Sequence, residues 1–420
     1  MATPRPEPAF VVDTAQRRAR LARRHALVEK VPDVESAARA MVALHGTDAS
    51  GPYVAAWARV PDFTTSALDD ALFGRRSLVR QMAMRRTLWV MEAGLLPPVV
   101  ASPGARTAGA ERRRLVRELE LDGGFGDVDR WVDAATAGVL RALADGVCRT
   151  AVELGPLVPE AAGRFVAAPG TRWGAEMPVL PRLLTILTAQ GMVVRGENRA
   201  GWTASRPTWT LTSTWLGGAV APMDPDAAHT ELVARWLRTF GPGTERDVQW
   251  WLGSTLGAVR RSLSELGAVP VGLEGSASVG WLPPDDVAPV EPVGPWVAVL
   301  PGLDPTTMGW VERDWYLGPH AREVVDKVGN AGPTIWVDGR VVGAWAASTG
   351  TVQVALLEDV GARARAAIDD EVARLTAWLA GGKVSPAFPS PLFGGRRHAP
   401  LPDAAPGRAP AGVPARPAAG

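Results

Sequence analysis

The predicted elements recur in one order along the chain, and this recurrence constrains the fold more than any other feature of the sequence. Apolar spacing predicts four helices within 15–28, 34–44, 50–58 and 66–72, and alternation predicts two strands within 77–91. Three or four helices followed by a short hairpin are typical of a winged helix, a form of the helix-turn-helix unit.

The same order of helices and hairpin is expected twice more, without any repeat of the residues themselves. The second occurrence has helices at 128–144, 150–157 and 180–190, then strands at 192–196 and 201–212. The third has helices at 227–240, 244–252 and 255–266, then strands at 268–274 and 278–282. The sequence therefore predicts three tandem winged-helix modules.

Beyond a Pro-rich linker at 283–295 the apolar period changes to two, which predicts four strands and then one helix at 361–379. From residue 395 onward large apolar side chains are nearly absent, so this segment cannot offset its ordering entropy. We predict an α+β chain with modules at 12–120, 121–220 and 221–290, a small C-terminal β-rich domain at 291–394 and a disordered tail at 395–420.

Composition and motifs exclude several classes of function. A chain of 420 residues with 46% hydrophobic residues can bury several cores, but no run of about 18 apolar residues predicts a membrane span. The one cysteine, Cys148, excludes an internal disulfide, and the five histidines show no metal-ligand spacing. No phosphate loop, dinucleotide fingerprint or serine elbow is present. We expect a cytoplasmic, nucleoid-associated monomer without metal, nucleotide or other cofactor.

Charge is unevenly distributed along the chain. Residues 14–120 carry 18 Lys and Arg against 11 Asp and Glu, a net charge of +7, whereas residues 121–394 carry 22 against 30, a net charge of −8. A positive amino-terminal part beside winged-helix modules favours double-stranded DNA as partner, although arginine-rich solvated faces and a GC-rich coding habit also explain such clusters. The candidate DNA-binding residues are Arg17, Arg18, Arg75, Arg76, Arg80, Arg85 and Arg86.

Four runs of residues carry a resemblance to a known family. They are MVALHGTDASGPYVAAWARVP (41–61), RSLVRQMAMRRTLWVM (76–91), LPGLDPTTMGWVERDWYLGPH (300–320) and VGNAGPTIWVDGRVVGAW (328–345). With them the chain resembles, over about residues 12–393, the bacterial winged-helix proteins that include the alkylpurine and interstrand-crosslink DNA glycosylases. The resemblance implies three winged helices and a terminal β-domain around duplex DNA, with hydrolysis of the N-glycosidic bond of an alkylated purine.

The resemblance also points to a catalytic element, from which this sequence departs. The family has glutamine, an apolar residue, then glutamine or aspartate, and the matching positions here are His45, Gly46 and Thr47, followed by Asp48. His45, with an ordinary pKa of about 6.5, is a candidate base, Thr47 can orient water, and Asp48 can hold His45 or act directly. The alternative is structural: Thr47 or Asp48 caps the next helix, and His45 ends the preceding one.

Two functions from different classes are consistent with these features. The first is a monofunctional DNA glycosylase for alkylated or crosslinked purines, with His45, Thr47 and Asp48 lining the cleft. The second is a non-enzymatic DNA-binding protein that recognises damage or duplex shape, or a transcriptional regulator, favoured by the loss of the glutamine pair.

Overall fold

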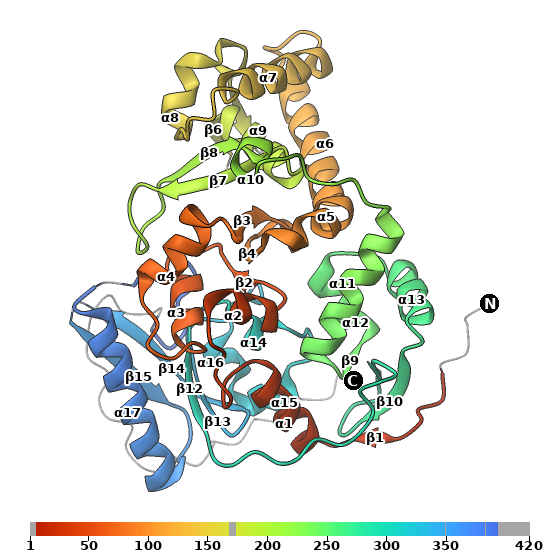
Figure 1. Ribbon diagram of the computed structural model, residues 1–420, viewed down its shortest axis with the longest axis vertical. Helices are drawn as coiled ribbons and strands as arrows, with labels where there is room; N and C mark the ends of the chain where they lie inside the picture. The colour runs from red at the N-terminus through yellow and green to blue at the C-terminus, as the bar shows by residue number, and fades with distance from the viewer. Residues whose placement is uncertain (1–5, 168–173, 349, 383, 394–420) are drawn as a thin grey trace, which may run out of the picture.

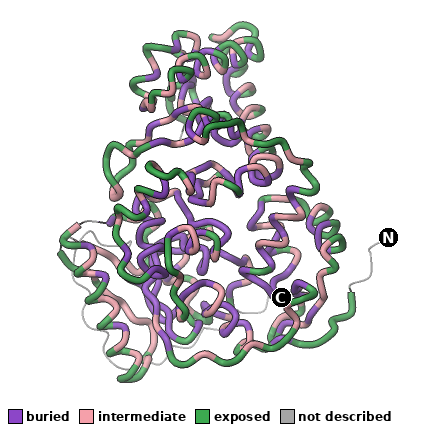
Figure 2. The backbone as a smooth tube through the Cα atoms, viewed as in Figure 1, coloured by how far each residue is buried: buried purple, intermediate pink, exposed green. Residues whose placement is uncertain are grey.

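The computed structural model describes residues 6–167, 174–348, 350–382 and 384–393, so the tail predicted at 395–420 lies outside the described residues. In Figure 1 residues 105–216 form an upper lobe, and a small sheet from residues 44–92 lies beneath it. The remaining elements build a wider lower body. Figure 2 shows the buried residues concentrated in that body and in the sheet. No helix among the described residues combines the length and apolar composition that a membrane crossing requires.

The first segment contains helices α1 (Thr14–Arg24), α2 (Val34–Ala40), α3 (Gly51–Trp57) and α4 (Thr65–Asp69), then η1 (Asp70–Gly74). Its three-stranded antiparallel sheet has the order β2 (Leu44–His45), β4 (Leu88–Glu92), β3 (Leu78–Met82), with η2 (Met84–Arg86) at the β3–β4 turn. Asp13 and Asp33 accept hydrogen bonds from Gln16 N and Ser36 N and so begin α1 and α2.

The predicted helix at 34–44 is shorter than expected, and this difference creates the candidate site. Helix α2 ends at Ala40, and Val42 has a φ of +62°, which no helix continues. The chain then pairs as a strand, with Leu44 opposite Val90 and His45 opposite Trp89. Because directly opposite residues share a face, the side chains of His45 and Trp89 lie on one side of the sheet.

The upper lobe has its own hydrophobic core. Its connection from the first sheet runs through η3 (Ala93–Leu95), α5 (Leu96–Val99) and η4 (Val100–Gly104). Its elements are α6 (Ala105–Asp122), α7 (Val128–Ala142), α8 (Ala151–Leu154), η5 (Gly155–Leu157), η6 (Pro159–Ala161), β5 (Arg164–Ala167), β6 (Ala175–Pro178), α9 (Leu180–Ala189), β7 (Val193–Asn198), β8 (Pro207–Leu211) and α10 (Thr212–Leu216). Ala108, Leu115 and Leu119 of α6, which the sequence assigns to the first module, pack into this core.

The third segment consists of α11 (Pro225–Phe240), β9 (Gly243–Thr244), α12 (Glu245–Leu252), α13 (Leu256–Glu265), β10 (Val269–Leu273) and β11 (Val279–Leu282). Thr244 and Asp247 form a reciprocal capping box that begins α12. The amino-terminal strand β1 (Val11–Val12) pairs in parallel with β10 and completes a sheet of order β1-β10-β11-β9. The start of the chain is therefore tied to this segment.

The last segment is an antiparallel sheet of order β12 (Val297–Leu300), β13 (Thr334–Val337), β14 (Arg340–Ser348), β15 (Thr351–Leu356). Helix α17 (Gly361–Leu379) packs against β12 and β15. The β12–β13 connection contains α14 (Pro305–Met308), α15 (Asp314–Leu317), η7 (Gly318–His320) and α16 (Ala321–Val324). The four strands and the closing helix predicted from the sequence are present.

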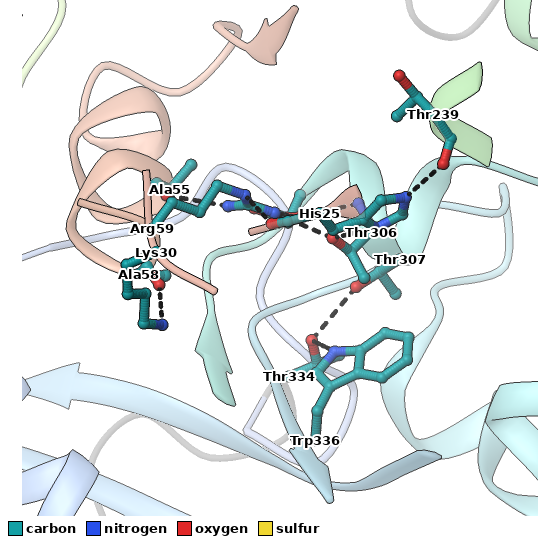
Figure 3. A network of polar contacts seen from close by, with 11 residues as sticks. His25, Lys30, Ala55, Ala58, Arg59, Thr239, Thr306, Thr307, Thr334 and Trp336 are labelled. Carbon is teal, nitrogen blue, oxygen red and sulfur yellow. Dashed lines mark hydrogen bonds and ion pairs between the residues drawn. The ribbon is translucent and has the colours of Figure 1, made fainter. Parts of the chain in front are cut away.

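A buried polar network joins three segments (Figure 3). The guanidinium of Arg59, just after α3, donates to both carboxylate oxygens of Asp304 at 2.9 and 2.8 Å, and both side chains are 0% exposed. Thr306 Oγ1 accepts from Arg59 Nη2 and contacts His25 Nδ1 at 3.0 Å, and His25 Nε2 lies 3.3 Å from Thr239 O at the end of α11. This network fixes the first segment against the third and the last.

Candidate functional site

The 45–48 element begins at the end of β2 and continues beside the start of β4. Gly46 N donates to Leu88 O at 2.6 Å, and a Cβ atom at Gly46 would stand 3.2 Å from the same oxygen. The main chain therefore approaches β4 too closely for most side chains. Arg80 of β3 donates from Nε to Gly46 O at 2.9 Å and from Nη2 to Gly46 O and, at 3.1 Å, to Asp48 O. One arginine thus fixes two carbonyls of the element.

His45 is buried and neutral. Its ring packs edge-on against Trp89, with centroids 4.8 Å apart, and Thr47 N approaches Nδ1 at 3.5 Å. Burial, together with the charges of Arg85 and Arg80, lowers the pKa of His45 to about 3. His45 therefore stays unprotonated at neutral pH, which suits a site for a cationic transition state but makes the ring a weak base.

Thr47 and Asp48 follow at a bend. Thr47 Oγ1 is buried and has no hydrogen-bond partner among the described residues. Asp48 Oδ1 accepts from Ala387 N at 2.9 Å, and burial raises the pKa of the Asp48 carboxyl above its ordinary value. The capping alternative is wrong: Ser50 is the N-cap of α3 without any side-chain bond, and His45 lies in a strand.

Of the two predicted arginines of the first helix, Arg17 is buried and Arg18 is half-buried. The guanidinium of Arg17 is 4.1 Å from the ring centroid of Trp315, and Arg17 is only 5% exposed. Arg18 donates to Trp315 O at 2.8 Å. Contact with DNA stays a prediction for both residues, and the contact with Trp315 of α15 holds the guanidinium of Arg17 away from solvent.

The other predicted arginines are distributed around the first sheet. Arg75 is exposed and forms ion pairs with Glu35 and Asp70, at 2.9 and 2.6 Å, and Arg76 is exposed and lies 4.1 Å over the ring of Trp215. At the β3–β4 turn, Arg85 lies 3.8 Å over the ring of Trp250, and the exposed Arg86 reaches Glu111 at 3.3 Å. The structure brings Arg80 and Arg85 close to His45 and does not gather all seven on one surface.

Two polar residues near the element were not singled out in the sequence. Gln81 of β3 is fully buried opposite Trp89, on the same face as His45, and its Oε1 has no hydrogen-bond partner among the described residues. Arg195 of β7 lies near Arg80, and its buried Nε has no hydrogen-bond partner within the described chain. For Gln81 a signal existed, because a polar side chain stands within an apolar strand. For Arg195 none did, because its neighbours come from a distant part of the chain.

The described residues contain no group of three or more His, Cys, Asp and Glu side chains placed to hold a metal ion. A cavity of about 790 Å³ lies between α12, α13 and β11, lined among others by Glu245, Arg260 and Trp281. None of its lining residues belongs to the 45–48 element, so the cavity is separate from the candidate site.

Comparison with known proteins assigns the chain to a family. The solved structure of the Streptomyces sahachiroi DNA glycosylase AlkZ matches 89% of this chain and 98% of its own, with a TM-score of 0.69 and 20% sequence identity, and so has a similar fold. No curated protein sequence matches the chain. The model of the family described as DNA glycosylase AlkZ-like matches residues 38–378, which include the 45–48 element, and the chain therefore belongs to the AlkZ-like DNA glycosylase family.

Proposed function

We propose that the protein hydrolyses the N-glycosidic bond of alkylated or crosslinked purines in double-stranded DNA, using the 45–48 element. The observation that carries this proposal is the family match, which spans the element and the sheet that holds it. The support from the site is local: a neutral histidine, an unpartnered hydroxyl and a carboxylate follow one another in four residues.

The reaction requires little from the protein beyond a positioned water and a negative charge. An N7-alkylated purine is already cationic, so the electron pair of the C1′–N9 bond leaves with the base without prior protonation. A water oxygen bonds to C1′ as that bond breaks, and its proton passes to a carboxylate. Positive charge that develops on the sugar is stabilised by the same carboxylate.

In this scheme Asp48 is the acid–base and electrostatic group. Burial raises the pKa of this carboxyl above its ordinary value, and Ala387 N orients its Oδ1 atom. The unpartnered Thr47 Oγ1 is available to hold the attacking water. Neutral His45 adds no positive charge next to the sugar and supports the turn through its contact with Thr47 N.

Three segments with the order of helices and hairpin are proposed to act as winged helices that hold the duplex. The exposed Arg75, Arg76 and Arg86 are the best placed of the predicted arginines for phosphate contacts, because exposure leaves their guanidinium groups within reach of a strand. When DNA binds, phosphate oxygens replace the carboxylates and aromatic rings that these guanidinium groups now contact.

The test incubates the purified protein with a duplex containing one N7-methylguanine, with a nitrogen-mustard-crosslinked duplex and with an undamaged duplex, then reveals abasic sites with alkali. We expect strand cleavage for at least one damaged duplex and none for the undamaged one. The variant H45Q, which restores the side chain found in the family, should keep the activity. No cleavage of either damaged duplex contradicts the proposal.

A second function is favoured by one observation: with a pKa of about 3, His45 cannot serve as an efficient general base at neutral pH. If Asp48 does not act in its place, the protein is a non-enzymatic DNA-binding member of the family. Tight, salt-sensitive binding to damaged duplex without cleavage in the same assay identifies this case.

A further inference from the structure

Two arginines without carboxylate partners lie close together where the upper lobe meets the first sheet. Arg80 is on β3 and Arg195 on β7, two strands that contact each other and lie one above the other in Figure 1. Arg80 bonds only to the carbonyls of Gly46 and Asp48, and its Nη1 donates to no described residue. The guanidinium of Arg195 donates to none of the described residues.

The position of Arg195 is fixed by its strand. Its guanidinium lies 5.4 Å from the ring centroid of Trp209, directly opposite on β8, and the register shifts after Arg195, which is a way of redirecting a side chain. The next residue, Gly196, has no room for a Cβ atom, which would stand 2.7 Å from Cys148 Sγ. Arg195 is thus held in place although nothing in the described chain neutralises it.

Burial and the charge of Arg80 lower the pKa of Arg195 to about 9, so it remains a cation at neutral pH. Arg195 is half-buried, and its buried Nε has no acceptor among the described residues. A partly desolvated cation without an acceptor costs free energy, and a neighbouring cation raises that cost. Such an arrangement is stabilised when an oxyanion supplies acceptors for several guanidinium donors at once.

We propose that Arg80 and Arg195 together bind an oxyanion, and that this anion is a phosphodiester of the DNA strand that passes the 45–48 element. Arg80 bonds to Gly46 O and Asp48 O, so an anion between the two arginines lies beside the proposed catalytic residues. Arg85, which packs against Trp250 of α12, also donates to no described residue. Cations without an ion pair to any described carboxylate therefore approach the element from two neighbouring segments, which suits a DNA strand better than a single free ion.

The identity of the anion rests on the proposed function, so the test measures binding and does not depend on base excision. Fluorescence anisotropy measures the binding of a short undamaged duplex at several salt concentrations. The proteins compared are the full-length native protein and the variants R195Q, R195K and R199Q. Arg199 is the matched control, because it follows the same strand but is exposed and paired with Glu153. In a second arm, the melting temperature of each protein is measured with and without inorganic phosphate at constant ionic strength.

R195Q should bind the duplex about tenfold more weakly, and the slope of log K against log salt should fall by about 1. R195K should keep the slope but lose part of the affinity, because a lysine cannot form the planar fork. R199Q should bind the duplex like the native protein. R195Q should melt no lower than the native protein, because the variant removes a half-buried cation that pairs with no described carboxylate.

Native affinity and slope in both R195Q and R195K overturn the proposal. If phosphate raises the melting temperature of the native protein but not of R195Q while duplex binding is equal, the site takes a free anion and the DNA assignment is wrong. If the native protein excises no base but its duplex binding depends on Arg195, this inference stands and only the enzymatic proposal is overturned.

Discussion

At the scale of single residues, the hydroxyl of Thr47 distinguishes a catalytic element from a structural turn. A buried hydroxyl without a partner lowers stability, and folded proteins keep few such groups without a reason. The variant T47V keeps the shape of the side chain and removes the hydroxyl. We expect its free energy of unfolding to rise by about 1 kcal/mol and its excision rate to fall. Urea denaturation and single-turnover excision measure the two effects.

The matched control is T214V, because Thr214 is exposed within α10 and its hydroxyl bonds to no described residue. It should change neither quantity, with stability within about 0.5 kcal/mol of the native protein. If T47V excises as fast as the native protein, the hydroxyl has no part in the reaction.

The buried state of His45 predicts a dependence of stability on pH. Its pKa is about 3 in the folded protein against an ordinary value of about 6.5 in the unfolded chain, so between these values the unfolded chain binds a proton that the folded chain does not. Stability is therefore lost as pH falls below 6.5. At pH 5 this loss is about 2 kcal/mol. The difference in unfolding free energy between the native protein and H45Q, measured from pH 7 to pH 5, should shift by that amount against the native protein.

The comparison with H45Q cancels the contributions of His25 and His229, whose pKa values burial also lowers. A difference that stays constant over this pH range means that His45 has an ordinary pKa and is open to solvent.

Residue roles could be predicted only in part. The sequence indicated the 45–48 element through the family resemblance, yet the surroundings that set the chemistry of His45 come from the sheet and from Arg80 and Arg85. Arg195 could not be found, because the charged residue that it approaches, Arg80, is separated from it by most of the upper lobe along the chain. Likewise Arg17 is buried against Trp315, and the apolar spacing of a basic helix does not indicate that contact.

At the scale of elements, the junction between α3 and α14 is held by a buried ion pair. Removing one partner in R59M leaves the Asp304 carboxylate without its guanidinium in a dry environment, which should cost about 3–5 kcal/mol. Replacing both, in R59M/D304L, should cost clearly less than R59M alone. A double-mutant cycle by urea denaturation measures the coupling.

The exposed pair Arg365–Asp369 within α17 serves as control, and R365M should cost less than about 1 kcal/mol. Equal losses in R59M and in the double variant would mean that packing, and not the charge pair, holds this junction.

Elements defined by local pattern were predicted well, and those defined by distant pairing were not. The hairpin β3–β4, the helices α11 to α13 and the terminal strands follow directly from apolar period and turn residues. Strand β1 has two residues and forms by pairing with the edge of β10, which lies far along the chain. Strands β5 and β6 were not predicted from the sequence, because their segment is polar. The predicted helix at 34–44 ends early, because Leu44 and His45 pair as strand β2 with Val90 and Trp89.

At the scale of the whole molecule, the charge asymmetry of the sequence has two different structural meanings. Part of the positive charge forms ion pairs within the lower body: Arg20 and Arg24 of α1 both pair with Asp286 in the linker before the last segment. Another part lies around the 45–48 element, where Arg80, Arg85 and Arg195 form no ion pair with a described carboxylate. Net charge therefore indicated a partner of opposite sign but not which arginines meet it.

The central claim is that the 45–48 element of this AlkZ-like fold hydrolyses an N-glycosidic bond with Asp48 as its carboxylate. The most direct measurement is the single-turnover rate of N7-methylguanine release from a duplex by the native protein, D48N and the exposed control D369N, with melting temperatures recorded for each. We predict that D48N is slower by about 100-fold or more, while D369N equals the native protein. A native rate in a folded D48N variant would contradict the account.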